Sequence, residues 1–127
     1  MKHLMLTLCL LTASCRGPLL EVQTPPGMDQ EPFGAPLAAL MARAPLDAPV
    51  DVVFGPIDAE VYGRSSWSFM EQSYRIEIQG DLTHEVAMDT LVHEWAHCLV
   101  HGACHESPHD ALWGVAYARA YRAIIGE

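Results

Sequence analysis

The sequence predicts an α+β domain in which a small antiparallel sheet, built around a hairpin, packs on a long helix followed by a second, C-terminal helix. Residues 73–79 alternate apolar and polar side chains, as a strand with one solvated face does. Residues 82–101 carry apolar side chains at helical spacing, and residues 109–125 form another helical segment after a loop. Strands followed by helices are typical of the α+β class.

The first 15 residues resemble a secretory signal peptide, possessing Lys2 and His3 ahead of an apolar run at residues 4–11. That run is too short to span a bilayer. Small residues precede Cys15, as at a bacterial lipoprotein cleavage site. We expect an exported protein, periplasmic or attached to a membrane through lipidated Cys15 and facing the periplasm or the outside. The alternatives are ordinary signal cleavage nearby and an unprocessed leader on a cytoplasmic protein.

Residues 16–36 are rich in Pro and Gly and are expected to form an extended tether. Residues 37–127 are long enough for one domain. Its first element is an Ala-rich helical segment at residues 37–44, which Pro45 ends.

The predicted sheet follows this short helix. Residues 50–54 form an apolar strand that Gly55 and Pro56 close, and residues 60–69 pair with residues 73–79 as a hairpin. The polar stretch at residues 64–68 is expected to be a plain edge strand, and the alternative is that it flanks a cleft.

The helix at residues 82–101 contains the sequence His-Glu-Trp-Ala-His. Asp81 or Thr83 can cap its start, and Gly102 can end it. Positions four apart share one helix face, so His93 and His97 can bind the same ion. Imidazole pairs of this kind suit zinc, and Glu94 can take a proton from water during attack on a carbonyl carbon.

The residues themselves leave the third metal ligand open. His101 lies two turns beyond His93, about 12 Å of helix rise, which is too far for one ion. The loop and the next helix offer other donors: His105, His109, Glu106 and Cys104.

The stretch from Asp89 to His97, with the Pro108-His109 and Trp113 element that follows, resembles the SprT-like zinc metallopeptidases. This resemblance covers roughly residues 91–121 and implies a minimal zincin-like fold. It implies that His93, His97 and His109 bind one zinc ion and that Glu94 is the general base.

Two further features concern the helices around the motif. Tyr117 lies two turns after His109 on the same side of the last helix, so it is a candidate donor to a transition-state oxyanion, or else a packed core tyrosine. Cys98 and Cys104 could pair in an oxidising compartment, but a buried, unpaired Cys98 is preferred.

Seven Lys and Arg residues against sixteen Asp and Glu residues give a net charge of −9, which disfavours nucleic acid as a partner. The sequence therefore predicts a zinc-dependent metallopeptidase acting on a peptide or protein substrate. The alternatives are a non-catalytic metal-binding lipoprotein and an amidase that acts on cell-wall material.

Overall fold

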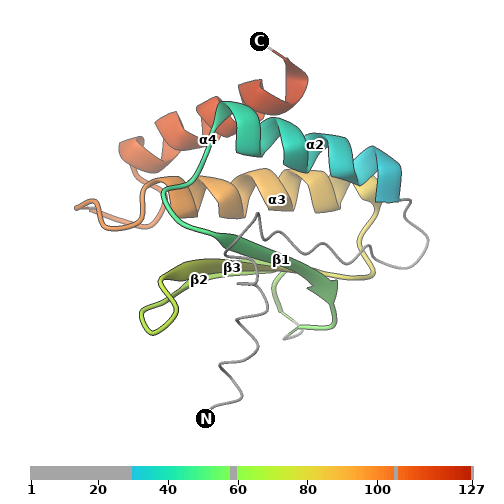
Figure 1. Cartoon of the computed structure of the whole chain (residues 1–127), viewed down its shortest axis with the longest axis horizontal. Coiled ribbons are helices and arrows are strands. Elements are labelled where there is room, and N and C mark those ends of the chain that lie inside the picture. Colours follow the sequence, from blue (N-terminus) through green and yellow to red (C-terminus); the bar gives the residue numbers. More distant parts are fainter. Residues whose placement is uncertain (1–29, 58–59, 105, 127) are drawn as a thin grey trace.

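The computed structural model describes residues 30–57, 60–104 and 106–126, so the predicted signal segment, Cys15 and most of the predicted tether lie outside it. The described chain has the predicted α+β architecture (Figure 1). Its elements are the helices α2 (Gln30–Arg43), α3 (His84–Leu99) and α4 (Ala111–Ile125) and the strands β1 (Val50–Gly55), β2 (Gly63–Ser68) and β3 (Ser73–Gln79). None of these helices combines the length and the apolarity needed to cross a lipid bilayer.

The three strands form one sheet in the order β1-β3-β2. Strands β2 and β3 are the predicted antiparallel hairpin, with Gly63 opposite Ile78 and Ser68 opposite Ser73. Strand β1 pairs with β3 in parallel, so the sheet is mixed and the predicted antiparallel pairing holds for its hairpin but not for β1. The direction of β1 follows from its connection to β2, which returns the chain to the far side of β3.

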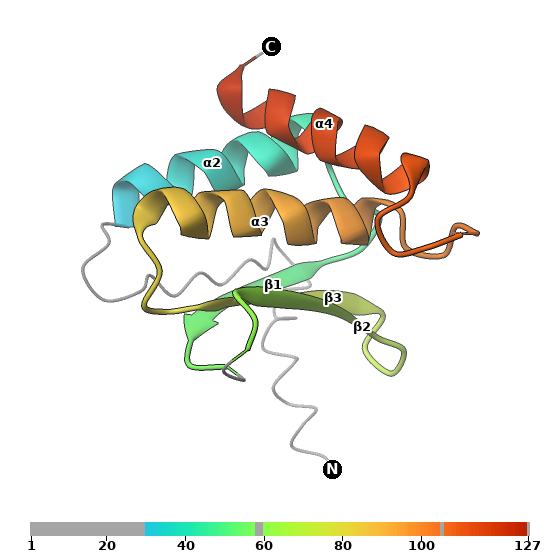
Figure 2. The same ribbon diagram turned by 180° about the vertical axis from the view of Figure 1, so that it is seen from behind.

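Helix α3 lies between the sheet and the other two helices (Figures 1 and 2). The inward sides of β1 and β3 are buried against it, and its opposite side packs on α2 and α4. Trp95, in the C-terminal half of α3, is fully buried, and its indole N–H donates to the carbonyl oxygen of Ala44 at 2.8 Å. This hydrogen bond fixes the end of α2 against α3.

Helix α2 begins at Gln30 rather than at residue 37, so the last part of the predicted tether is helical. Pro36 lies inside the helix and removes one internal hydrogen bond. The predicted part of this helix is anchored in the core, where Leu37 and Leu40 are 1% and 0% exposed. The prediction rested on local propensity and on the Pro and Gly content of residues 16–36, which did not indicate the earlier start.

Candidate metal centre

Helix α3 presents the predicted pair of histidines on one side and a packed core on the other. Thr83 caps its first turn, because its hydroxyl accepts a 3.3 Å hydrogen bond from the backbone N–H of Val86. The helix is two residues shorter at each end than predicted. His93 and His97 are half-buried, which leaves their rings able to face a shared ligand.

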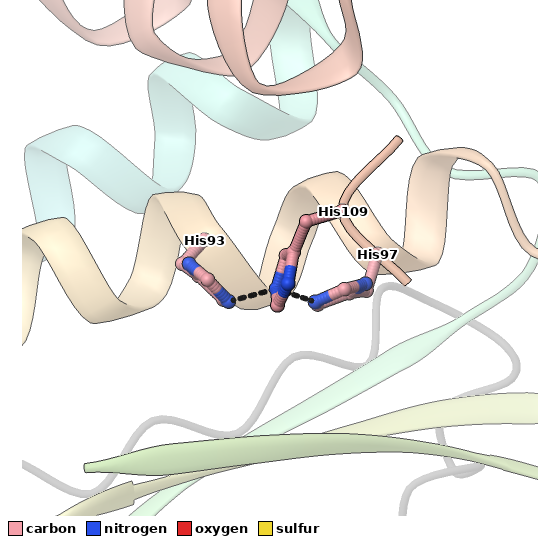
Figure 3. Close-up of side chains that lie close together, drawn as sticks. All are labelled: His93, His97 and His109. Atoms are coloured by element: carbon pink, nitrogen blue, oxygen red, sulfur yellow. Dashed lines mark hydrogen bonds between the residues drawn. The ribbon is translucent and has the colours of Figure 1, made fainter. Parts of the chain in front are cut away.

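His109 lies just before α4 and reaches back between the two α3 histidines (Figure 3). Its Nε2 atom is 3.1 Å from Nε2 of His93 and 3.2 Å from Nε2 of His97. Each of the three residues offers a ring nitrogen, and these atoms lie within 4.8 Å of one another. The three side chains are close enough to bind one metal ion.

The donor set fits zinc. In a tetrahedral site with Zn–N bonds of roughly 2.0–2.1 Å, neighbouring nitrogens are about 3.4 Å apart, close to the separations that His109 makes here. Hydrogen bonds alone account for the cluster poorly, because the single Nε2 atom of His109 cannot satisfy two facing Nε2 atoms well. One cation would satisfy all three lone pairs.

Asp110 holds His109 at the entrance to α4. Its Oδ1 accepts from the backbone N–H of Trp113 at 3.2 Å, which caps the helix, and its Oδ2 accepts from the backbone N–H of Glu106 at 3.0 Å. One carboxylate thus joins the loop to the first turn of α4. His109, between these two contacts, is carried on a constrained backbone.

The indole of Trp113 packs on all three imidazoles. Its ring centroid is 4.9 Å from that of His93, 5.7 Å from that of His97 and 4.7 Å from that of His109. These contacts restrict the tilt of each ring from the side of α4. Trp113 therefore supports the three histidines of the candidate metal centre, a role that the sequence prediction did not give it.

Glu94 lies between the two α3 ligands in sequence and is only 8% exposed. Burial raises the pKa of its carboxyl group, while a hydrogen bond from the Ser65 hydroxyl and the nearby His93 and His109 act in the opposite direction. A raised pKa makes a carboxylate a stronger base. Ser65 belongs to β2, so the edge strand supplies a partner for the predicted general base.

A groove of about 530 Å³ contains the cluster and Glu94. One side is helix α3, and the other is strand β2, which supplies residues 63–67. The polar stretch at residues 64–68 was expected to be an edge strand or to flank a cleft. It does both, because β2 is at the edge of the sheet and lines the groove. The groove is open to solvent rather than enclosed, so an extended chain could enter it.

The other candidate ligands lie outside the cluster. His101 is exposed and its ring packs on Trp67 instead, while Cys104 and Glu106 are exposed loop residues. His105 lies outside the described residues. Within the described chain, the histidine chosen by the family resemblance is the one that joins His93 and His97.

The hydroxyl of Tyr117 donates a 2.6 Å hydrogen bond to Oδ1 of Asp89, one turn before His93 on α3. This bond and burial raise the pKa of Tyr117 to about 12. The contact ties α4 to α3 beside the metal centre. A role for Tyr117 as a transition-state donor stays a prediction.

Cys98 and Cys104 are unpaired, as preferred from the sequence. Cys98 is buried beneath the groove, where burial and the charge of Glu94 raise the pKa of its thiol to about 12. It therefore acts as a small apolar side chain in the core.

Gly63 was not singled out in the sequence, yet it sets how closely β2 approaches α3. A Cβ atom at this position would lie 2.5 Å from Cγ2 of Thr90, 3.0 Å from the carbonyl oxygen of Glu77 and 3.5 Å from Cγ of Glu94. Only glycine permits this approach, which brings Ser65 to Glu94. The sequence signal that could have identified Gly63 is a glycine within the strand predicted at residues 60–69, since such a glycine often marks a close backbone approach.

Comparisons of the chain with protein-family models, with curated proteins and with solved structures found no match.

Proposed function

We propose that this protein is a zinc-dependent metallopeptidase that binds an extended peptide in the groove between β2 and α3. The observation that carries the proposal is the convergence of His93, His97 and His109 next to the buried carboxylate of Glu94, inside an open groove. The resemblance of the same residues to SprT-like peptidases supports this function.

Each residue has a distinct part in the proposed reaction. The three imidazoles would hold the ion, which when bound acts as a Lewis acid that polarises a carbonyl group and lowers the pKa of water. Glu94 accepts a proton from the attacking water and returns it to the leaving amine. The Ser65 hydroxyl orients the Glu94 carboxylate, and Trp113 keeps the imidazoles in place.

Strand β2 offers a way to hold the substrate. In the sheet order β1-β3-β2 it pairs only with β3 among the described strands, so its other edge can accept a further strand. Extended peptides commonly bind by adding to such an edge. The substrate backbone would then run beside the metal ligands.

The number of metal ligands favours an enzyme over a metal-braced, non-catalytic lipoprotein. Structural zinc sites have four protein ligands, whereas catalytic sites keep one position for water. The cluster in the described part of the chain has three members. Replacing His105, which lies outside that part, should leave zinc content and activity unchanged.

The test compares zinc content and peptide cleavage in the wild type, Glu94→Gln and the matched control Glu85→Gln, which changes an exposed carboxylate in the first turn of the same helix. Glu94→Gln should keep its zinc and lose activity by about 10²- to 10⁴-fold, as expected for a general base. Full activity in Glu94→Gln would overturn the proposal, and cleavage of peptidoglycan amides but of no peptide would favour the amidase alternative.

A further inference from the structure

The residues of β2 that face α3 form a row along the groove: Gly63, Ser65 and Trp67. Gly63 lies against Thr90, and Ser65 hydrogen-bonds Glu94 and Cys98. Two residues of a strand span about 6.7 Å and four residues of a helix span about 6 Å. Each second residue of β2 therefore lies opposite each fourth residue of α3. Strand and helix therefore run in the same direction along the groove.

Three aromatic rings end this row, and we call them the aromatic wall: Trp67, Tyr74 and His101. The ring centroid of Trp67 is 4.8 Å from that of Tyr74 and 5.0 Å from that of His101, and Tyr74 and His101 are 5.6 Å apart. All three residues line the same groove as the metal ligands. The wall is thus continuous with the proposed catalytic centre.

The inner part of the wall, Trp67 on Tyr74, is held in place by contacts. Tyr74 is 3% exposed, and its hydroxyl donates a 2.7 Å hydrogen bond to Oδ1 of Asp47. Trp67, itself half-buried, rests on that fixed ring. A surface that is already ordered loses little entropy when a ligand side chain packs on it.

The two ends of the groove differ in chemistry. The hollow at the other end, beyond Gly63, is lined by the carboxylate residues Glu60 and Asp89 as well as by Val61 and Tyr62. A large apolar side chain of a substrate would displace water from those carboxylates, which is unfavourable. At the aromatic wall the same side chain would pack on ring faces. The wall is the end that suits an apolar side chain.

Strand direction decides on which side of the cleaved bond this side chain lies. Antiparallel pairing is slightly more stable than parallel pairing. A peptide added antiparallel to β2 has its N-terminal part beside Trp67 and its C-terminal part beside Gly63. The metal ligands His93 and His97 lie between these two ends.

We propose that the aromatic wall of Trp67, Tyr74 and His101 is a specificity subsite that binds an aromatic or large aliphatic side chain on the N-terminal side of the cleaved peptide bond. This inference rests on the proposed peptidase function. It makes the substrate an extended peptide with an apolar residue within the first few positions before the cleavage site.

The first experiment digests a mixed peptide library with the zinc-loaded protein and identifies the cleavage sites by mass spectrometry. Aromatic and large aliphatic residues should be enriched before the cleaved bond. Trp67→Ala should lower kcat/KM for a Phe-containing peptide, relative to its Ala-containing analogue, by about 10- to 100-fold, as expected for loss of a hydrophobic pocket. The matched control Phe69→Ala, on the same hairpin but 79% exposed and outside the groove, should keep the preference.

The second experiment measures binding without cleavage, by calorimetry of the same two peptides with full-length Glu94→Gln. The Phe peptide should bind more tightly, and adding Trp67→Ala should remove the difference, while Trp67→Phe should restore most of it. His101→Ala removes an exposed part of the wall, so it tests the proposal even if Trp67→Ala does not fold.

The outcomes separate the two proposals. Cleavage with no apolar preference, or with that preference only after the cleaved bond, would overturn the subsite and leave the peptidase function intact. Absence of cleavage for every peptide would overturn the peptidase function. Equal binding of the Phe and Ala peptides to Glu94→Gln would independently overturn the subsite.

Discussion

Gly63 of β2 lies so close to Thr90 of α3 that a Cβ atom on the glycine would be 2.5 Å from Cγ2 of the threonine. This contact sets the distance between the edge strand and the helix that carries His93 and Glu94. The width of the groove at the metal centre therefore depends on a residue that has no side chain.

Gly63→Ala should force β2 away from α3 and disturb the contact between Ser65 and Glu94. We expect a loss of stability of about 1–3 kcal/mol, as for overpacking, together with reduced peptidase activity. Chemical denaturation and peptide cleavage measure the two effects.

Two variants control for this substitution. Gly63→Ala combined with Thr90→Ser removes the clashing methyl group, keeps the hydroxyl that bonds the Val86 carbonyl oxygen, and should recover part of the stability. Gly114→Ala, inside α4 with open space around its Cβ position, should instead raise stability by about 0.5–1 kcal/mol. A Gly63→Ala protein as stable as the wild type would contradict the prediction.

Asp110 has two separable functions, because its two oxygens bind different N–H groups. Asp110→Ala should lose the cap of α4, at a cost of about 1 kcal/mol, and should also loosen the loop that carries His109. Asp110→Asn can keep the cap through Oδ1 but presents an N–H group to the N–H of Glu106.

Thermal unfolding of the metal-free protein measures the stability that the helix cap contributes. A zinc titration against a chromophoric chelator measures zinc affinity, which depends on the loop that carries His109. In thermal unfolding, Asp110→Asn should be as stable as the wild type. In the zinc titration, Asp110→Asn should have the weakened affinity of Asp110→Ala. Equal zinc affinity in all three proteins would show that the loop contact does not position His109.

Trp113→Ala removes the ring that packs on the three imidazoles and should weaken zinc binding by about 10- to 100-fold, as loss of a support beneath metal ligands does. Leu112→Ala, a neighbouring α4 residue that is 47% exposed, is the matched control and should bind zinc normally. Circular dichroism should show that both variants keep their helices. Unchanged affinity in Trp113→Ala would be evidence against a supporting role.

Glu77 on β3 predicts a pH dependence of stability. Burial raises the pKa of its carboxyl group, but hydrogen bonds and charge interactions with Arg64 and Arg75 outweigh this effect and lower the pKa below its ordinary value of 4.5. Because the folded-state pKa is lowered, the stabilisation is present above pH 4.5 and is lost as pH falls through the folded-state value.

Urea denaturation of the zinc-free protein at a series of acidic pH values tests this prediction. Glu77→Gln should lower stability at neutral pH and flatten the decrease below pH 4.5, and added salt should reduce the difference because Glu77 and its partners are partly exposed. Glu60→Gln, an exposed change of the same charge, should leave the wild-type pH profile in place. If the stability of Glu77→Gln depended on pH in the same way as that of the wild type, Glu77 would not be the source of this pH dependence.

The elements with strong local signals could be predicted from the sequence. The alternation from Ser73 to Gln79 gave β3 with its correct bounds, and the apolar spacing around His93 and His97 gave α3 to within two residues. The face shared by the two histidines is a property of a single helix, so the spacing alone was enough.

Features that depend on distant contacts could not be predicted in this way. The parallel pairing of β1 depends on β3, which lies about 20 residues further along the chain. Spacing alone left several candidates for the third ligand, and the family resemblance chose His109. The contributions of Ser65 and Trp67 arise only when β2 is placed over α3, because a polar edge strand has the same sequence with or without a groove beside it.

The third ligand reaches the other two only across a loop that is fixed by the first turn of α4. During synthesis His93 and His97 leave the ribosome first, and a nascent chain that stops before His109 carries only two of the three histidines in the cluster. If the protein acts as proposed, three-ligand metal binding has to wait for helix α4, and a chain without that helix would not be an active peptidase.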